Sequence, residues 1–132
     1  MSNNFEYKDE SIEIEIFIGD ARKYIKNLQS IDIVYQDAFS SEVNSELWSV
    51  EYFKDIYKIC SEDCIMTSYS IATPVRLSMF EAGFEIYQIK PSGEKKQTIA
   101  LKNKKDIDAK YIDMNLKKQR NKEAKALYDK KN

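Results

Sequence analysis

Three short stretches of this sequence place reactive side chains where a run of apolar residues ends. The first is Gly19-Asp20-Ala21, the second is Asp37 with Phe39, Ser40 and Trp48 beyond it, and the third is Tyr69, which Arg76 follows. The 132 residues include no histidine, which excludes His-based triads, His general bases and His-ligated zinc. Any proton transfer must therefore use Asp, Glu, Lys, Tyr or Cys.

Asp37 is the strongest candidate for chemistry among these residues. An acid that ends a buried strand, with no helix start directly after it, is costly unless it is paired or functional. The other residues have structural explanations as well. Asp20 suits the N-cap of the following helix, and Trp48 suits packing in the core or in a loop. Arg76 could pair with Asp37 or be solvated, and these alternatives stay open at the level of the residues.

The elements that must position these residues alternate between strands and helices. Strands are predicted at Ser11–Ile18, Ile31–Tyr35, Cys64–Ser70, Phe84–Ile89 and Gln97–Leu101. Helices are predicted at Ala21–Leu28, at Val50–Cys60 after a Ser49 N-cap, from Thr73-Pro74 to a stop at Gly83, and at Leu116–Tyr128. The strand Ile31–Tyr35 is expected to be covered on both faces.

This order predicts an α/β fold with a mostly parallel, helix-covered sheet and a C-terminal antiparallel hairpin at one edge. The carboxyl ends of parallel strands lie at the same edge of a sheet, and open α/β sheets bind their ligands there. We therefore expect the three stretches to meet at one edge.

Composition limits the classes of protein that the chain can belong to. Its length favours one domain, and 42% hydrophobic with 33% charged residues indicates a globular chain. No apolar run has the ~20 residues of a membrane span, and the first residues lack the layout of a signal peptide. A cytoplasmic protein without membrane contact is therefore predicted. Cys60 and Cys64 are interpreted as buried thiols flanking a helix end, and no metal site is expected.

Charge is distributed unevenly along the chain. From Lys102 onward there are 11 basic and 5 acidic residues, a balance of +6, which leaves −7 on the first 101 residues. Such a segment can be a solvated tail or can contact phosphates. We divide the chain into a body, residues 1–108, and a basic helical tail, residues 109–132.

Four blocks in order resemble one family, the methyltransferase domain of the bacterial tRNA 5-methylaminomethyl-2-thiouridine biosynthesis protein MnmC. They are "GDAR" at Gly19–Arg22, "DIVYQDAFSSEVNSELWS" at Asp32–Ser49, "MTSYSIATPVR" at Met66–Arg76 and "EAGFEIYQI" at Glu81–Ile89. The likeness spans roughly Ile12 to Leu101. Its most specific part is Asp37-Ala38-Phe39-Ser40 followed by Glu46-Leu47-Trp48.

The resemblance implies a class I, Rossmann-like fold and transfer of a methyl group from S-adenosyl-L-methionine to the aminomethyl group of a wobble uridine in tRNA. By that likeness, Gly19, Asp20 and Ala21 contact the cofactor and Asp37 acts at the amine. The substrate contacts are then Phe39, Ser40, Trp48, Tyr69 and Arg76, with aromatic rings stacking on a base. The basic tail would contact the RNA backbone.

The chain departs from the family pattern in several places. Serines stand at Ser41 and Ser45 where the family has prolines, and Lys95-Lys96 replaces a Lys-Arg pair. Its three glycines, Gly19, Gly83 and Gly93, form no Gly-x-Gly turn. The likeness therefore indicates the C-terminal portion of the domain, without the first βαβ half, and implies a complementing chain or a homodimer. A non-catalytic fragment or RNA- or protein-interaction module, and an aminopropyltransferase-like enzyme, are the alternatives.

Overall fold

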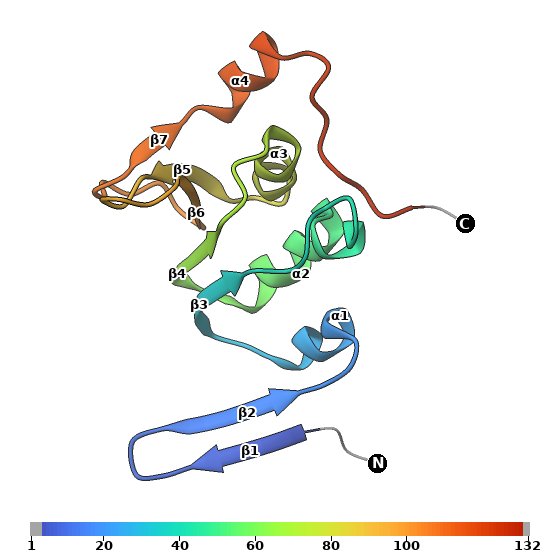
Figure 1. Ribbon diagram of the computed structural model, residues 1–132, viewed down its shortest axis with the longest axis vertical. Helices are drawn as coiled ribbons and strands as arrows, with labels where there is room; N and C mark the ends of the chain where they lie inside the picture. Colours follow the sequence, from blue (N-terminus) through green and yellow to red (C-terminus); the bar gives the residue numbers. More distant parts are fainter. Residues whose placement is uncertain (1–3, 131–132) are drawn as a thin grey trace.

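The computed structural model describes residues 4–130, which form a five-stranded sheet with helices beside it and a separate two-stranded hairpin (Figure 1). The strands are β1 (Asn4–Lys8), β2 (Glu13–Phe17), β3 (Ile31–Gln36), β4 (Cys60–Ser68), β5 (Glu85–Ile89), β6 (Gln97–Leu101) and β7 (Lys110–Ile112). The helices are α1 (Ala21–Tyr24), α2 (Val50–Ile59), α3 (Thr73–Glu81) and α4 (Met114–Arg120), with 3-10 turns η1 (Ile25–Asn27) and η2 (Ser45–Leu47).

The five-stranded sheet has the order β3-β4-β6-β5-β7, and β1 pairs with β2 in the separate hairpin. Strands β3 and β4 are parallel, whereas β4–β6, β5–β6 and β5–β7 are antiparallel. The sheet is therefore less parallel than expected. Strands β3, β4 and β5 do run in one direction. However, β6 lies between β4 and β5 and runs opposite to both, so its pairings with β4 and with β5 are antiparallel. The β5–β6 pair is an antiparallel hairpin, as predicted, but β6 lies inside the sheet and not at its edge. The edge is formed by β7, a strand that the sequence did not indicate.

Local signals set several helix ends as predicted. The Ser49 Oγ accepts a hydrogen bond from the Tyr52 N–H at 3.2 Å and caps α2. Helix α3 starts at Thr73 with Ala72 in the N-cap position, one residue earlier than the Thr73-Pro74 pair suggested. It ends before Gly83, whose φ of +120° disfavours a side chain. A Cβ there would also lie 3.1 Å from the Tyr57 ring.

The core lies between one face of the sheet and helices α2 and α3. Phe53 and Ile56 of α2 and Met79 of α3 are fully buried against Met66 of β4 and Ile86 of β5. These positions explain the periodic apolar residues of the two helices. They also fix which ends of β3 and β4 stand beside the starts of α2 and α3.

The opposite face of the sheet is covered only in part. The loop after β6 covers Tyr87, whose OH donates to the Lys105 carbonyl at 2.9 Å and accepts from the Lys105 N–H at 2.8 Å. By contrast, Ile33, Tyr35 and Ile65 are exposed on β3 and β4. The expectation that Ile31–Tyr35 is buried on both faces was therefore wrong, because α2 and α3 pack on one face only and leave Ile33 and Tyr35 exposed on the other.

The C-terminal segment is helical over a shorter range than Leu116–Tyr128. Helix α4 ends at Arg120, and residues 121–130 run without regular secondary structure along the helix side of the molecule (Figure 1). The Val50 N–H donates to the Leu127 carbonyl, and the Leu127 N–H donates to the Ser78 Oγ, both at 2.7 Å. A helix through this range could not offer the Leu127 backbone to α2 and α3, so tertiary contacts override the local helix preference.

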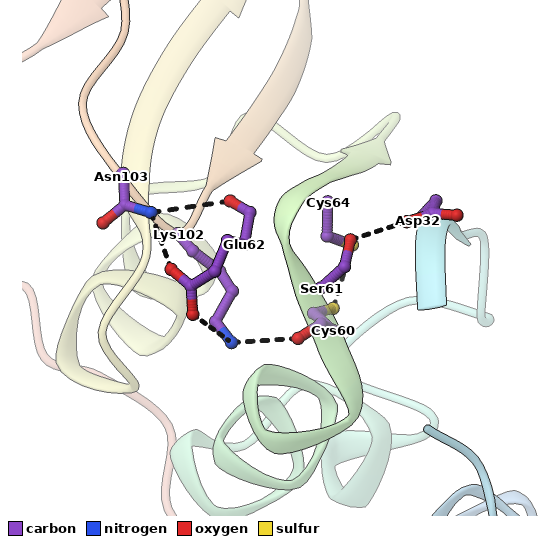
Figure 2. A network of polar contacts seen from close by, with 7 residues as sticks. All are labelled: Asp32, Cys60, Ser61, Glu62, Cys64, Lys102 and Asn103. Carbon is purple, nitrogen blue, oxygen red and sulfur yellow. Dashed lines mark hydrogen bonds and ion pairs between the residues drawn. The ribbon is translucent and has the colours of Figure 1, made fainter. Parts of the chain in front are cut away.

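A polar network joins the start of β4 to β3 and to the end of β6 (Figure 2). The Ser61 Oγ donates to Asp32 at 2.6 Å, and the Lys102 Nζ donates to the Cys60 carbonyl at 2.9 Å. The β3–β4 register shifts here, between Ile31 and Ile33, and the extra β4 residues bring the Cys64 thiol to 2.9 Å from the Cys60 Sγ. Both thiols are free and buried, as predicted.

Within residues 4–130, no helix is long and apolar enough to cross a membrane. The same described part of the chain has no group of three or more Cys, Asp or Glu side chains arranged to hold a metal ion.

Candidate functional site

The parallel pairing of β3 with β4 brings two of the predicted site stretches together. Gln36 is opposite Ser68 in the register, so the next residues, Asp37 and Tyr69, leave the sheet side by side. The Tyr69 OH donates a hydrogen bond to the Ala38 carbonyl at 2.8 Å and ties the two strand ends to each other. This meeting at the carboxyl edge confirms the prediction for two of the three stretches. The prediction was wrong for Gly19-Asp20-Ala21, because the strand before it, β2, belongs to the separate hairpin and not to this sheet.

The loop from Asp37 to Trp48 is fixed to the sheet at both ends. The Gln36 Nε2 donates to the Leu47 carbonyl, and the Trp48 Nε1 donates to the Phe39 carbonyl, each at 2.6 Å. The Trp48 ring meets the Tyr69 ring edge-on, with centroids 5.8 Å apart. Sequence reasoning missed Gln36. The available signal was a polar residue at a position that the strand pattern would have made apolar.

These contacts leave an acid and two rings facing solvent. The Asp37 carboxylate is exposed, the Phe39 ring is 77% exposed and the Tyr69 ring is half exposed. Asp37 drew attention in the sequence because an acid at the end of a buried strand is costly. This cost does not apply here, because β3 is an edge strand and Asp37 is exposed. Among residues 4–130 no side chain donates a hydrogen bond to this carboxylate, so it is free to accept one from a ligand.

Trp48 and Arg76 lie deeper than a surface contact would require. Trp48 is 1% exposed, and its ring packs on Phe53 and Tyr69. Arg76 is also buried and does not pair with Asp37. Its Nε donates to the Thr98 Oγ1 at 2.8 Å and its Nη2 to the Gln88 Oε1 at 3.1 Å.

Burial lowers the pKa of the Arg76 guanidinium from its usual value. The Thr98 hydroxyl donates in turn to the Ser70 carbonyl at 2.6 Å. Arg76 therefore joins α3, β5 and β6 beneath the loop that follows β4. Direct contacts of Trp48 and Arg76 with a substrate stay predictions.

The Gly19-Asp20-Ala21 stretch lies between β2 and α1. The Asp20 Oδ1 accepts from the Arg22 N–H at 2.9 Å, which confirms the predicted N-cap. The turn is braced by Phe17 and Tyr24, whose rings stack at 4.4 Å. Asp20 is exposed, so its second carboxylate oxygen can accept a hydrogen bond from a ligand.

Helix α1 is held to the rest of the molecule by the C-terminal segment. The Arg22 Nη1 donates to the Asp129 Oδ1 at 2.8 Å, and the Asp129 N–H donates to the Glu51 Oε1 at 3.0 Å. This ion pair raises the pKa of Arg22 and lowers the pKa of Asp129. Residues of the 42–46 loop, Arg22 and Asp129 line a pocket of about 480 Å³.

Comparison with known proteins decides the family. The model of a family described as S-adenosyl-L-methionine-dependent methyltransferase matches residues 1–104. The chain belongs to this family. This match supports, over most of the chain, the likeness to MnmC methyltransferase domains that the four sequence blocks suggested. The mixed α/β fold is the fold of these methyltransferases.

Relatives with a printed description support the same assignment. A "tRNA 5-methylaminomethyl-2-thiouridine biosynthesis bifunctional protein MnmC" from Paracidovorax citrulli is 32% identical over 77 residues, 58% of this chain and 12% of that protein. An uncharacterised protein of Methanocaldococcus jannaschii is 36% identical over 100 residues, 74% of this chain and 28% of the relative. The crystal structure of MnmC2 from Aquifex aeolicus superposes with a TM-score of 0.72 at 31% identity, covering 86% of this chain and 37% of that one.

The chain thus spans a minor part of each of these relatives. Asp20 offers an exposed carboxylate of the kind that accepts hydrogen bonds from an adenine amino group. A Gly-rich turn of backbone N–H groups, which cradles the polar end of nucleotide cofactors, has no counterpart in this sequence, whose three glycines lie apart.

Proposed function

We propose that this chain provides the amine-facing part of a methyltransferase site that methylates the aminomethyl group of a wobble uridine in tRNA. The observation that carries the proposal is the meeting of the β3 and β4 ends, where Asp37, Phe39 and Tyr69 are all exposed and the Tyr69 OH is bonded to the Ala38 carbonyl between Asp37 and Phe39. Membership of the methyltransferase family and the MnmC relatives supply the reaction class and the substrate class. A cytoplasmic location is part of the same proposal.

Asp37 is assigned the proton chemistry. An amine attacks a methyl group only through a free lone pair, so its extra proton must leave. The exposed carboxylate can hold the amine by a hydrogen bond and accept that proton, without any histidine. S-adenosyl-L-methionine, when bound, supplies the electrophilic methyl group.

Aromatic residues are assigned the binding of the base. Phe39 and Tyr69 present open faces on which a splayed-out uridine can stack. Trp48, Ser40 and Arg76 support them. Trp48 holds the Phe39 carbonyl, the Ser40 carbonyl accepts from the Val43 and Asn44 N–H groups, and Arg76 holds the β5–β6 hairpin under the Ser70 loop. The basic residues of the C-terminal segment are assigned to the tRNA backbone.

Calorimetric titration with S-adenosylhomocysteine tests the cofactor assignment. Binding in the micromolar range should weaken in Asp20→Asn, which keeps the helix cap because Asn caps as well as Asp does. Arg120→Gln, a change of one charge away from the turn, serves as the control and should bind as the parent does. A folded chain that does not measurably bind S-adenosylhomocysteine, either alone or together with a complementing methyltransferase chain, would refute the proposal.

Transfer of labelled methyl groups to tRNA tests Asp37. Asp37→Asn should lower the rate by about 10²- to 10⁴-fold, the usual contribution of a general base. Glu42→Gln, an exposed acid in the same loop, should leave the rate within about twofold. Equal effects of the two variants would mean that Asp37 contributes only general negative charge.

A non-catalytic RNA-binding module is the second candidate, because the sequence lacks a Gly-rich turn. It predicts tRNA binding without binding of S-adenosylhomocysteine. A titration of the chain with tRNA, done beside the titration with S-adenosylhomocysteine, therefore separates it from the methyltransferase proposal.

A further inference from the structure

Residues 121–130, which we call the strap, lie along the helices although they form no regular secondary structure (Figure 1). The Leu127 carbonyl accepts from the Val50 N–H at the start of α2, and the Leu127 N–H donates to the Ser78 Oγ of α3. The strap also packs on the core through three partly buried apolar residues, Ala124, Ala126 and Leu127. These contacts fix the strap on α2 and α3 and thereby determine where Asp129 lies.

Asp129 joins the first turns of two helices. Its Oδ1 accepts from the Arg22 Nη1 of α1 at 2.8 Å, and its backbone N–H donates to the Glu51 Oε1 of α2 at 3.0 Å. The Arg22 and Asp129 side chains are 24% and 31% exposed, so the ion pair is shielded from water in part. Hydrogen bonds from Arg22 and from the Ser49 hydroxyl lower the pKa of Asp129, so its charge is kept throughout the neutral range.

Each of these two helix starts carries a part of the proposed site. Asp20 caps α1 two residues before Arg22, and Trp48, whose indole holds the Phe39 carbonyl, comes directly before the cap of α2. Among residues 4–130, no strand pairing joins the β1–β2 hairpin to the five-stranded sheet, so the sheet does not set where Asp20 lies relative to Asp37. That relation depends on how α1 packs beside α2 and on the strap that ties the two helices together.

Transfer of a group between two bound molecules depends on the distance between them. A displacement of about 1 Å can lower the rate by about 100-fold. We propose that the strap is a positioning element of the methyl-transfer site, in which Asp129 holds the Asp20 turn at its working distance from the Asp37 loop. The inference rests on the proposed function. The family model matches residues 1–104, so membership of the family does not account for the strap.

Amide hydrogen exchange, followed residue by residue, tests the coupling without any measurement of activity. The Tyr24 and Ile25 N–H groups report on α1, because each donates to a carbonyl in the first turn of that helix. Asp129→Ala removes the carboxylate and keeps the backbone bond to Glu51. It should speed exchange of both amides by about two- to fivefold, the usual effect of one partly exposed ion pair.

A double-mutant cycle shows whether the effect comes from the ion pair itself. Arg22→Gln should speed exchange of the same amides as Asp129→Ala does. The variant with both changes should exchange no faster than either single variant, because each change deletes the same interaction.

Steady-state transfer of labelled methyl groups to tRNA tests the positioning role. Asp129→Ala should lower kcat by about 10-fold and leave KM for tRNA and for S-adenosyl-L-methionine within about twofold, because the contacts of each ligand are unchanged and only their distance from each other is altered. Asp129→Glu keeps the negative charge and should recover most of the parent kcat.

Lys118→Gln is the matched control. It deletes another ion pair, in which the Lys118 Nζ of α4 lies 2.7 Å from the Glu81 Oε1 of α3, away from both helix starts. It should shift the urea midpoint about as much as Asp129→Ala does. Exchange at Tyr24 and Ile25 and the value of kcat should stay at the parent level.

Three results would overturn the inference. They are unchanged exchange at Tyr24 and Ile25 in Asp129→Ala, additive effects in the double variant, and a kcat of Asp129→Ala that equals that of Lys118→Gln. Failure of the proposed function gives a different result. A parent chain that transfers no methyl group refutes that function, and the exchange data then decide by themselves whether Asp129 couples α1 to α2. Transfer at the parent rate by Asp129→Ala would refute the role of the strap and leave the proposed function intact.

Discussion

Replacing Trp48 by Phe should loosen the loop that carries Asp37, and the structure sets the size of the effect. The substitution removes the 2.6 Å hydrogen bond from the Trp48 Nε1 to the Phe39 carbonyl. It also leaves part of a fully buried site empty between Phe53 and Tyr69. Loss of the bond costs about 1 kcal/mol, or about 1–3 kcal/mol where the carbonyl stays shielded from water. With the smaller ring, the total loss of unfolding free energy should be about 2–4 kcal/mol.

Urea unfolding followed by circular dichroism measures this loss. Fluorescence cannot be used for the variant, because Trp48 is the only tryptophan in the chain. With a slope of about 2 kcal/mol per molar urea, in the middle of the usual range, the midpoint should fall by about 1–2 M. Amide hydrogen exchange near Phe39 should also become faster in the variant, since the indole would no longer hold the Phe39 carbonyl, while the Gln36 bond to the Leu47 carbonyl remains.

Phe39→Ala is the matched control for this prediction. It deletes the exposed Phe39 ring but keeps the carbonyl that Trp48 holds, so it should change the unfolding free energy by no more than about 0.5 kcal/mol. If Trp48→Phe also stays within about 0.5 kcal/mol of the parent, the loop is not held by the indole. The argument that Trp48 supports the site, in place of stacking on substrate, would then fail.

Three further predictions concern the parts of the fold around the site. The Arg22 ion pair lowers the pKa of Asp129 below its ordinary 3.8, so the contribution of the pair to the unfolding free energy is present above pH ~4 and is lost as the pH falls through the lowered value. In urea titrations, Asp129→Asn should flatten this acid dependence by less than about 1 kcal/mol. An unchanged pH profile would contradict this prediction. Burial raises the pKa of the Cys60 thiol, so Ellman's reagent at pH 8 should label neither Cys60 nor Cys64 until urea is added, and rapid labelling of the folded chain would refute their burial. Ser78→Ala should cost about 1–3 kcal/mol and speed proteolysis within residues 121–130, because the buried Ser78 Oγ accepts from the backbone of that segment; an intact, equally stable variant would show that the segment is held by other contacts.

Much of the local structure could be predicted because its signals lie within a few residues of each other. The alternation of Ile12 to Ile18 predicts a strand in any environment, and β2 lies there. Ser49 and Gly83 set helix ends through bonds and backbone angles that involve only their neighbours. The acid and the aromatic residues after Ile31–Tyr35 were likewise placed correctly at a strand end.

Burial and partnership could not be predicted in the same way, because they depend on residues far apart in the chain. Arg76 was expected to meet Asp37 or solvent, but it lies among groups 12 and 22 residues further along, which only the β5–β6 hairpin brings beside α3. The residues after Arg120 have helical composition, yet they run without regular secondary structure because Val50 and Ser78 bind the backbone of Leu127.

The sequence alone determined the types and order of most elements, the strand-end position of Asp37 and the resemblance to a methyltransferase family, since each of these rests on local pattern. Tertiary structure decided which of those residues face solvent. It placed β6 between β4 and β5, it buried Trp48 and Arg76, and it left β3 at the edge with Ile33 and Tyr35 uncovered. The physical reason is that the environment of a side chain is set by the elements packed around it, and no local period specifies which elements those are.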